Sequence, residues 1–158
     1  MIKFFFRLLF LGLVIQTQAM MTPREFFERL NKDTMNLVDE FYHPDVDFQD
    51  PVTSLHGPAA IKRHYLHQYT NVKSIRWEFP SEIKSGNLFS FEWVMVLSHP
   101  SLNGGKEFRV PGSSFMKMAP NGQVIYHRDY FDMGDFVYDR LPVFRWVNSF
   151  IKSKLKDH

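Results

Sequence analysis

The sequence predicts one domain of the α+β class, with helices packed on one face of a curved antiparallel sheet. Apolar residues recur at helical spacing over residues 22–41 and again after residue 57. From residue 73 to residue 132 the composition favours strands separated by turns, and residues 135–156 return to helical spacing. Helices and strands segregated along a chain in this way are typical of α+β folds.

The composition narrows the functional classes. A chain of 158 residues can form one core, and a hydrophobic content of 44%, with 17 Phe, argues against disorder. The formal net charge of +2 is too small to indicate nucleic acid as a partner. The chain has no Cys, which excludes disulfides and zinc sites built on thiolates.

Residues 1–19 have the features of a signal peptide. Lys3 and Arg7 give a positively charged N-terminal region, residues 8–15 are apolar, and residues 17–19 form a small-residue cleavage site. This interpretation predicts export to the periplasm or the medium. The alternative is a cytoplasmic protein that starts at Met20 or Met21.

The first helical stretch is expected to begin with Thr22 as its cap, to break at residues 31–33, and to end before Pro44. A strand over residues 46–50 follows, and then a helix from residue 57 to about residue 69. Strand-forming segments complete the domain, over residues 75–79, 88–98, 106–110, 113–118 and 124–132.

The last of these strands carries charged groups on both of its faces. Alternation places two sets of side chains on opposite sides: Ile125, His127, Asp129 and Phe131 on one, and Tyr126, Arg128, Tyr130 and Asp132 on the other. Buried charges need partners or a function. Asp129 and His127 therefore form either a reaction site, a polar clamp for a ligand, or an internal pair whose members are hydrogen-bonded to each other without a ligand.

The order of elements resembles the nuclear-transport-factor-2-like superfamily, and within it the SnoaL-like domains. The resemblance rests on FYHPDVDFQDP at residues 41–51, GPAAI at residues 57–61 and NGQVIYHRDYFD at residues 121–132, and it covers about residues 24–140. It implies a cone, in which N-terminal helices cap a bent sheet whose concave face encloses a pocket. Relatives include polyketide cyclases, ketosteroid isomerases and limonene epoxide hydrolases.

The resemblance implies candidate catalytic residues. Asp50 matches the carboxylate base of ketosteroid isomerases, but the places of their two hydrogen-bond donors hold Phe26 and Ser114. Asp129 matches a catalytic carboxylate of limonene epoxide hydrolases, whose other catalytic groups are replaced here by Phe48, Asp50, Trp93 and Met95. SnoaL-type cyclases use a carboxylate to remove an acidic proton from carbon, which Asp129 or Asp50 could do.

We therefore expect Asp129, His127 and Asp50 as catalytic residues in an apolar pocket. The expected ligand-binding residues are Phe26, Phe48, Trp93, Met95, Ser114 and Met116. The expected function is a cofactor-independent lyase, isomerase or cyclase acting on an apolar carbonyl compound. The alternatives are a non-catalytic binder of an apolar metabolite and a protein-interaction module. His64 and His67 lack a carboxylate that would complete a metal site, so no metal is expected.

The domain proper is expected over residues 22–140, and residues 141–158 form a separate basic amphipathic helix. Its apolar side is formed by Val143, Phe144, Trp146, Val147, Phe150, Ile151 and Leu155. Arg145, Lys152 and Lys156 lie opposite, and Lys154 falls on the apolar side. The favoured expectation is that the helix packs on the sheet or closes a homodimer. The alternative is contact with a membrane surface.

Overall fold

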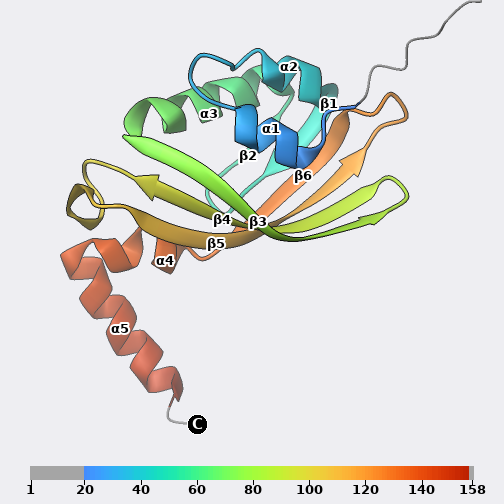
Figure 1. Ribbon diagram of the computed structural model, residues 1–158. Coiled ribbons are helices and arrows are strands. Elements are labelled where there is room, and N and C mark those ends of the chain that lie inside the picture. Colours follow the sequence, from blue (N-terminus) through green and yellow to red (C-terminus); the bar gives the residue numbers. More distant parts are fainter. Residues whose placement is uncertain (1–19, 157–158) are drawn as a thin grey trace, which may run out of the picture.

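The computed structural model describes residues 20–156, so the predicted signal peptide lies outside the described residues. Helices α1, α2 and α3 cover one face of a curved six-stranded sheet, and the C-terminal helices lie beyond its end (Figure 1). The strands are β1 (Tyr42–Gln49), β2 (Ser54–His56), β3 (Ser74–Ser85), β4 (Leu88–Ser98), β5 (Phe108–Met118) and β6 (Val124–Phe131). The helices are α1 (Pro23–Arg29), α2 (Leu37–Phe41), α3 (Pro58–Asn71), α4 (Met133–Phe136) and α5 (Pro142–Lys156), with short 3₁₀ turns η1 (Asn103–Gly105) and η2 (Tyr138–Arg140).

The predicted α+β class is confirmed. The strand order is β2-β1-β6-β5-β4-β3, and all neighbours are antiparallel except β1 and β6, which are parallel. Parallel neighbours need a long connection, and here α3 and the β3–β5 strands separate β1 from β6 in sequence. This pairing brings residues 41–51 and 121–132 to the centre of the sheet.

The first helix begins as predicted. The Thr22 hydroxyl accepts a hydrogen bond from the Glu25 amide, and the Glu25 carboxylate accepts one from the Thr22 amide, which together form a capping box. Strand β1 starts at Tyr42, four residues earlier than expected, and includes Pro44. The β1–β6 register shifts between Tyr42 and Asp47, so Pro44 lies where the ladder is interrupted.

Strand β5 is one strand and not the two that the sequence predicts. Pro111, between the two expected segments, pairs with Val94 of β4 and lies just outside the β5–β6 pairing, which begins at Gly112. A Cβ atom at Gly112 would lie 2.3 Å from the ring of Trp93 on β4. Glycine is therefore required there, because the indole lies directly over the β5 backbone.

The core lies between α1–α3 and the covered face of the sheet. Its fully buried members include Phe26, Val38, Tyr42, Val46, Ile61, Val110, Met116 and Val124. Aromatic rings pack closely at its centre, where Phe26 stacks on Phe41 with ring centroids 4.1 Å apart. The same core encloses the polar side chains described below.

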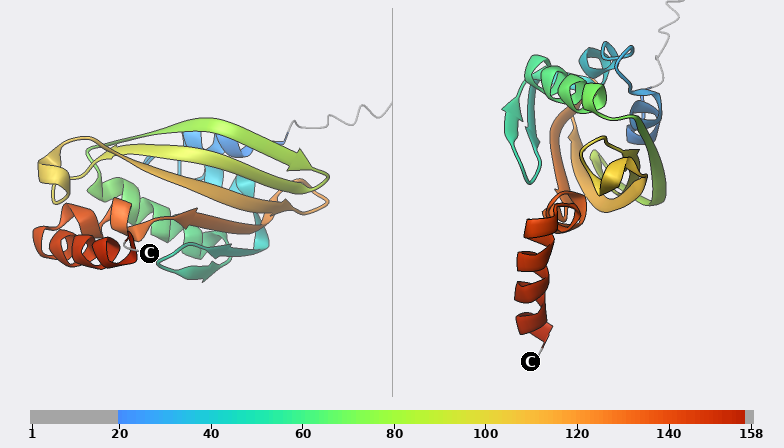
Figure 2. Two further views of the ribbon diagram at one scale, coloured as in Figure 1. Left: turned by 90° about the horizontal axis from the view of Figure 1, so that it is seen from below. Right: turned by 90° about the vertical axis from the view of Figure 1, so that its left-hand side faces the viewer.

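The expectation that α5 packs its apolar side on the sheet is wrong. Figure 2 shows α5 leading away from the body, and Trp146 and Leu155 are each 72% exposed. The reason is that Asp139 of η2 binds Asn148 and Lys152 on the polar side of the helix. None of the helices within residues 20–156 is long and apolar enough to cross a membrane.

Candidate functional site

A cavity of about 220 Å³ lies between α3 and the inner faces of β3, β4 and β6. Its aromatic lining residues are Phe27, Phe48, Tyr65, Tyr69, Trp77, Trp93, Phe131 and Phe136. Its polar lining residues are Asp50, His64, His67, Gln68, Asn71, His99 and Asp129. An apolar cavity with a few polar groups is the usual form of a small-molecule site.

Asp129 is the carboxylate that β6 places in the cavity wall. Its Oδ1 accepts a hydrogen bond from His127 Nε2 at 2.8 Å and another from the Ser114 hydroxyl. Its Oδ2 has no hydrogen-bond partner among residues 20–156. Asp129 is therefore held in place through one oxygen, and the other keeps its capacity to accept a proton.

His127 is fully buried behind Asp129 and does not line the cavity. A carboxylate only accepts hydrogen bonds, so the proton between the two residues belongs to Nε2 of His127. In the neutral ring Nδ1 is then an acceptor, and the Tyr42 hydroxyl lies 2.7 Å from it. The Tyr65 hydroxyl lies 3.0 Å from that of Tyr42. A chain of four side chains thus connects α3 to the cavity carboxylate.

The two tyrosines in this chain remain neutral. Burial raises the pKa of Tyr42 well above its usual range, and the hydrogen bond with Tyr65 only partly opposes it. Burial likewise raises the pKa of Tyr65, and the nearby Tyr42 adds to the increase. Neutral phenols keep their protons and can donate. The chain therefore orients the imidazole without adding a second negative charge beside Asp129.

Ser114 and Trp93 hold Asp129 from the side of β5 and β4. The register pairs Ser114 with Asp129 directly, and the Trp93 indole N–H donates to the Ser114 hydroxyl at 2.9 Å. That hydroxyl in turn donates to Asp129. Because the indole can only donate, it leaves the serine proton free to point at the carboxylate.

A second carboxylate, Asp50, lies in the cavity wall at the end of β1. Its Oδ1 accepts hydrogen bonds from the amides of Val52 and Thr53, each at 2.7 Å. Its Oδ2 lies 3.4 Å from Nε2 of His64 on α3. Burial alone would raise the pKa of Asp50, but the interaction with His64 and the two amide bonds outweigh it, so the pKa is lowered. Asp50 is therefore a stabilised anion and a weak base.

Five of the expected site residues line the cavity: Asp50, Asp129, Phe48, Trp93 and Met95. The other four lie beneath its wall, fully buried or nearly so: His127, Ser114, Phe26 and Met116. His127 and Ser114 reach the cavity only through Asp129, whereas Phe26 and Met116 belong to the core.

Sequence reasoning missed the tyrosines and the role of His64. Tyr65 and Tyr69 are four residues apart on α3, a spacing that places both on one face of a helix together with Ile61. That pattern predicts a face turned toward the core, and it could have identified both hydroxyls as site candidates. Nothing in the sequence indicates that His64 meets Asp50 or that Tyr42 meets His127.

The comparisons with known proteins agree with the fold. The model of the SnoaL-like domain family matches residues 24–127, which is well over half of the chain. No curated protein matches this chain. The matched segment runs from α1 to His127 on β6 and thus includes Asp50, Ser114 and the Tyr42–His127 pair.

Solved structures resemble the chain in fold at low sequence identity. A proposed SnoaL-like polyketide cyclase from Shewanella denitrificans is 18% identical, with a TM-score of 0.63 over 75% of this chain and 92% of that one. A protein with a ketosteroid isomerase-like fold from Catenulispora acidiphila, in complex with trimethylamine, is 13% identical, with a TM-score of 0.62 over 74% of this chain and 86% of that one. TerC, co-crystallised with polyporic acid, is 19% identical, with a TM-score of 0.57 over 66% of this chain and 85% of that one.

Proposed function

Because this chain belongs to the SnoaL-like domain family, we propose that it binds an apolar carbonyl compound in the cavity and catalyses its isomerisation, cyclisation or cleavage with Asp129 as the base. The fold hosts several activities, so the proposal rests on the site itself. The observation that carries it is the arrangement of Asp129, which has one oxygen fixed by His127 and Ser114 and the other without a partner within residues 20–156.

The proposed step is the removal of a proton from the carbon beside the carbonyl group. The free oxygen of Asp129 takes the proton, and the electrons of the C–H bond move to the carbonyl oxygen to form an enolate. The enolate carbon then attacks an electrophile in the same substrate, or, where the enolate is conjugated with a C=C bond, the far carbon of that system takes the proton and the double bond moves. Asp129 returns its proton in the closing step, so the reaction needs no external reagent.

Tyr69 is the donor that we propose for the enolate oxygen. It lines the same cavity, and its hydroxyl accepts a hydrogen bond from the Trp77 indole at 3.3 Å, which leaves its own proton available. Burial raises the pKa of Tyr69 to about 12, so the phenol keeps its proton at neutral pH. A preorganised donor of this kind stabilises the charge that develops on the substrate oxygen.

The test is proton exchange on a model substrate. 1-Tetralone is an apolar aromatic ketone with exchangeable hydrogens beside its carbonyl group, and their loss in deuterium oxide is followed by proton NMR. We expect the parent to accelerate exchange and Asp129→Asn to abolish the acceleration, while Asp45→Asn, which changes an exposed carboxylate of β1, has no effect. Asparagine can still accept both hydrogen bonds at its carbonyl oxygen, so the fold is retained. Equal exchange rates in the parent and Asp129→Asn would refute the assignment of Asp129 as the base.

Non-catalytic binding is the second candidate, and one observation favours it. Asp129 already has two donors inside the protein, so its charge is compensated without a substrate. Native mass spectrometry of the purified protein separates the two functions. A retained apolar ligand in both the parent and Asp129→Asn, with no exchange activity in either, would support a binder.

A further inference from the structure

Helix α5 is attached to the body by its polar side. Asn148 donates a hydrogen bond to Asp139 at 2.7 Å, and the Lys152 ammonium lies 3.1 Å from the other oxygen of the same carboxylate. An amphipathic helix that belongs to a core does the opposite, because it buries its apolar side and leaves its polar side in water. Within residues 20–156 the apolar side of α5 is therefore left largely uncovered; Phe144, at its beginning, stacks on Tyr138 of η2 with ring centroids 6.0 Å apart.

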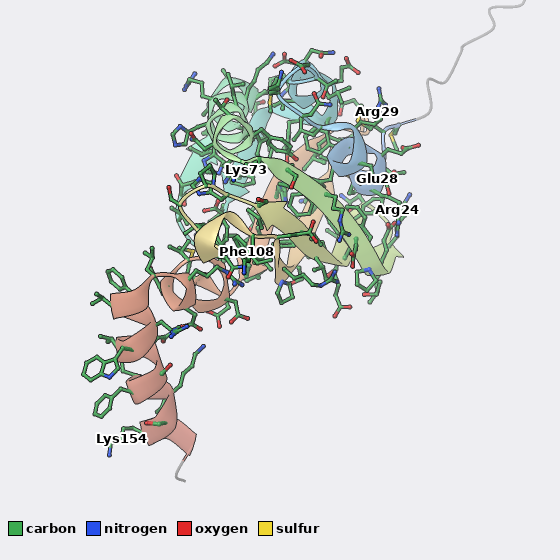
Figure 3. All side chains as sticks on the ribbon, turned by 60° about the vertical axis from the view of Figure 1, so that its left-hand side comes forward. Arg24, Glu28, Arg29, Lys73, Phe108 and Lys154 are labelled. Atoms are coloured by element: carbon green, nitrogen blue, oxygen red, sulfur yellow. The ribbon has the colours of Figure 1, made fainter. Side chains whose placement is uncertain are left out.

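The exposed side is large and rich in aromatic residues. Its members are Val143, Phe144, Trp146, Val147, Phe150 and Ile151, joined by Leu155, and all of them are exposed. Figure 3 shows aromatic rings on this side of the helix, turned away from the sheet, together with Lys154. A continuous apolar surface of this kind on a soluble body marks a binding surface.

We propose that this side of α5 binds the interface of an anionic lipid bilayer. Charge is the first argument for a lipid partner. Residues 142–156 contain four basic residues, namely Arg145, Lys152, Lys154 and Lys156, and no acidic residue. A helix with one aromatic and aliphatic side and only positive charges lies in the headgroup region of such a bilayer, with its apolar side in the acyl boundary.

Lys154 is the argument against a second copy of the chain as the partner. It follows Phe150 by one helical turn, and its ammonium lies 5.8 Å from the centre of the Phe150 ring, on the apolar side of the helix. In a helix pair built on this side, its charge would be removed from water without an acidic residue of α5 to compensate it. At a bilayer the long side chain reaches up to the lipid phosphates while its methylene groups stay in the apolar layer.

The experiment is vesicle flotation of the full chain, so that residues 1–19 contribute equally to every variant. Vesicles of phosphatidylcholine alone are compared with vesicles that also contain phosphatidylglycerol. We expect binding only to the anionic vesicles, weakened by salt. The double substitution Trp146→Ser, Phe150→Ser should lower the vesicle partition coefficient by about tenfold or more, because binding scales with the apolar area inserted. Ile83→Ser is the matched control, since Ile83 is equally exposed on β3 at 69%.

Tryptophan fluorescence gives an independent measurement. The chain has three Trp, and Trp77 and Trp93 lie in the domain core whereas Trp146 is on the exposed side of α5. Brominated lipids should quench the Trp146 signal. Trp146→Phe should abolish this quenching and still float with anionic vesicles.

Three outcomes would overturn the proposal. One is equal flotation of the parent and the double variant, and another is the absence of quenching by brominated lipids. The third is a dimer in solution, without vesicle binding, that the double substitution dissociates. That result would assign the apolar side to a second copy of the chain.

Discussion

The hydroxyl of Tyr42 lies 2.7 Å from Nδ1 of His127, although the two residues are 85 positions apart in the sequence. Their rings are nearly parallel, with centroids 5.9 Å apart. Because Nε2 donates its hydrogen bond to Asp129, Nδ1 of the neutral ring accepts one from the Tyr42 hydroxyl, and the two bonds together hold the imidazole in place. A residue of the core thus determines how the cavity carboxylate is held.

Tyr42→Phe should remove this control at a measurable cost. The substitution leaves Nδ1 of a fully buried imidazole, and the Tyr65 hydroxyl as well, without their partner. An unsatisfied buried group costs about 1–3 kcal/mol of the free energy of unfolding, which urea denaturation measures. Tyr130→Phe is the control, because Tyr130 is exposed on the same sheet. Equal stability of the two variants would show that the Tyr42 bond does not hold the ring.

Gly112→Ala should destabilise the fold and displace Trp93 in the cavity wall. The new Cβ atom would collide with the Trp93 ring at 2.3 Å, so either the β5 backbone or the indole must move. Overpacking of this kind costs about 1–3 kcal/mol. We also expect a change in tryptophan fluorescence, because Trp93 lines the cavity and donates to Ser114. Ser113→Ala, one residue further along β5, should leave both measurements unchanged.

Alternation along β6 correctly predicted that His127 and Asp129 share one side of the sheet. The two side chains point the same way because the register of β6 with β5 is regular from Tyr126 to Phe131, beyond the shift near its beginning. The alternation does not predict how deeply each side chain is buried. His127 pairs with Phe48 of the neighbouring strand β1 and is covered by the helices. Asp129, two residues further along β6, lines the cavity.

The remaining features depend on contacts between distant segments. The Asp50–His64 pair requires the exact placement of α3 over the end of β1, and the parallel β1–β6 pairing was not predicted because no local signal distinguishes it. The amphipathic nature of α5 was predicted from its spacing. The side that faces the body was not, since it is decided by Asp139, which lies outside the helix.

Asp50 should make the fold sensitive to acid. Its pKa is lowered in the folded protein, so its ionised form stabilises the fold above the ordinary carboxyl pKa of about 3.9. That contribution is lost as the pH falls through the lowered folded value. Asp50→Asn should therefore reduce the free energy of unfolding by about 1–3 kcal/mol near neutral pH. The difference from the parent should shrink in acid. A constant difference across a pH series of urea titrations would show that ionisation of Asp50 does not contribute.

Tyr69→Phe tests the proposed donor without changing the shape of the cavity. The ring remains, but the hydroxyl that would stabilise the enolate oxygen is lost, so the exchange rate of 1-tetralone should fall by about 100-fold. Because burial raises the pKa of Tyr69 to about 12, the parent phenol stays protonated over the neutral range, and the loss should be the same from weakly acidic to weakly alkaline pH. Tyr126→Phe, on β6 but outside the cavity lining, is the matched control for removal of a phenol. An unchanged rate in Tyr69→Phe, together with the loss in Asp129→Asn, would keep the base and assign the donor to another polar group of the cavity, with Gln68 and His64 on α3 as the next to substitute.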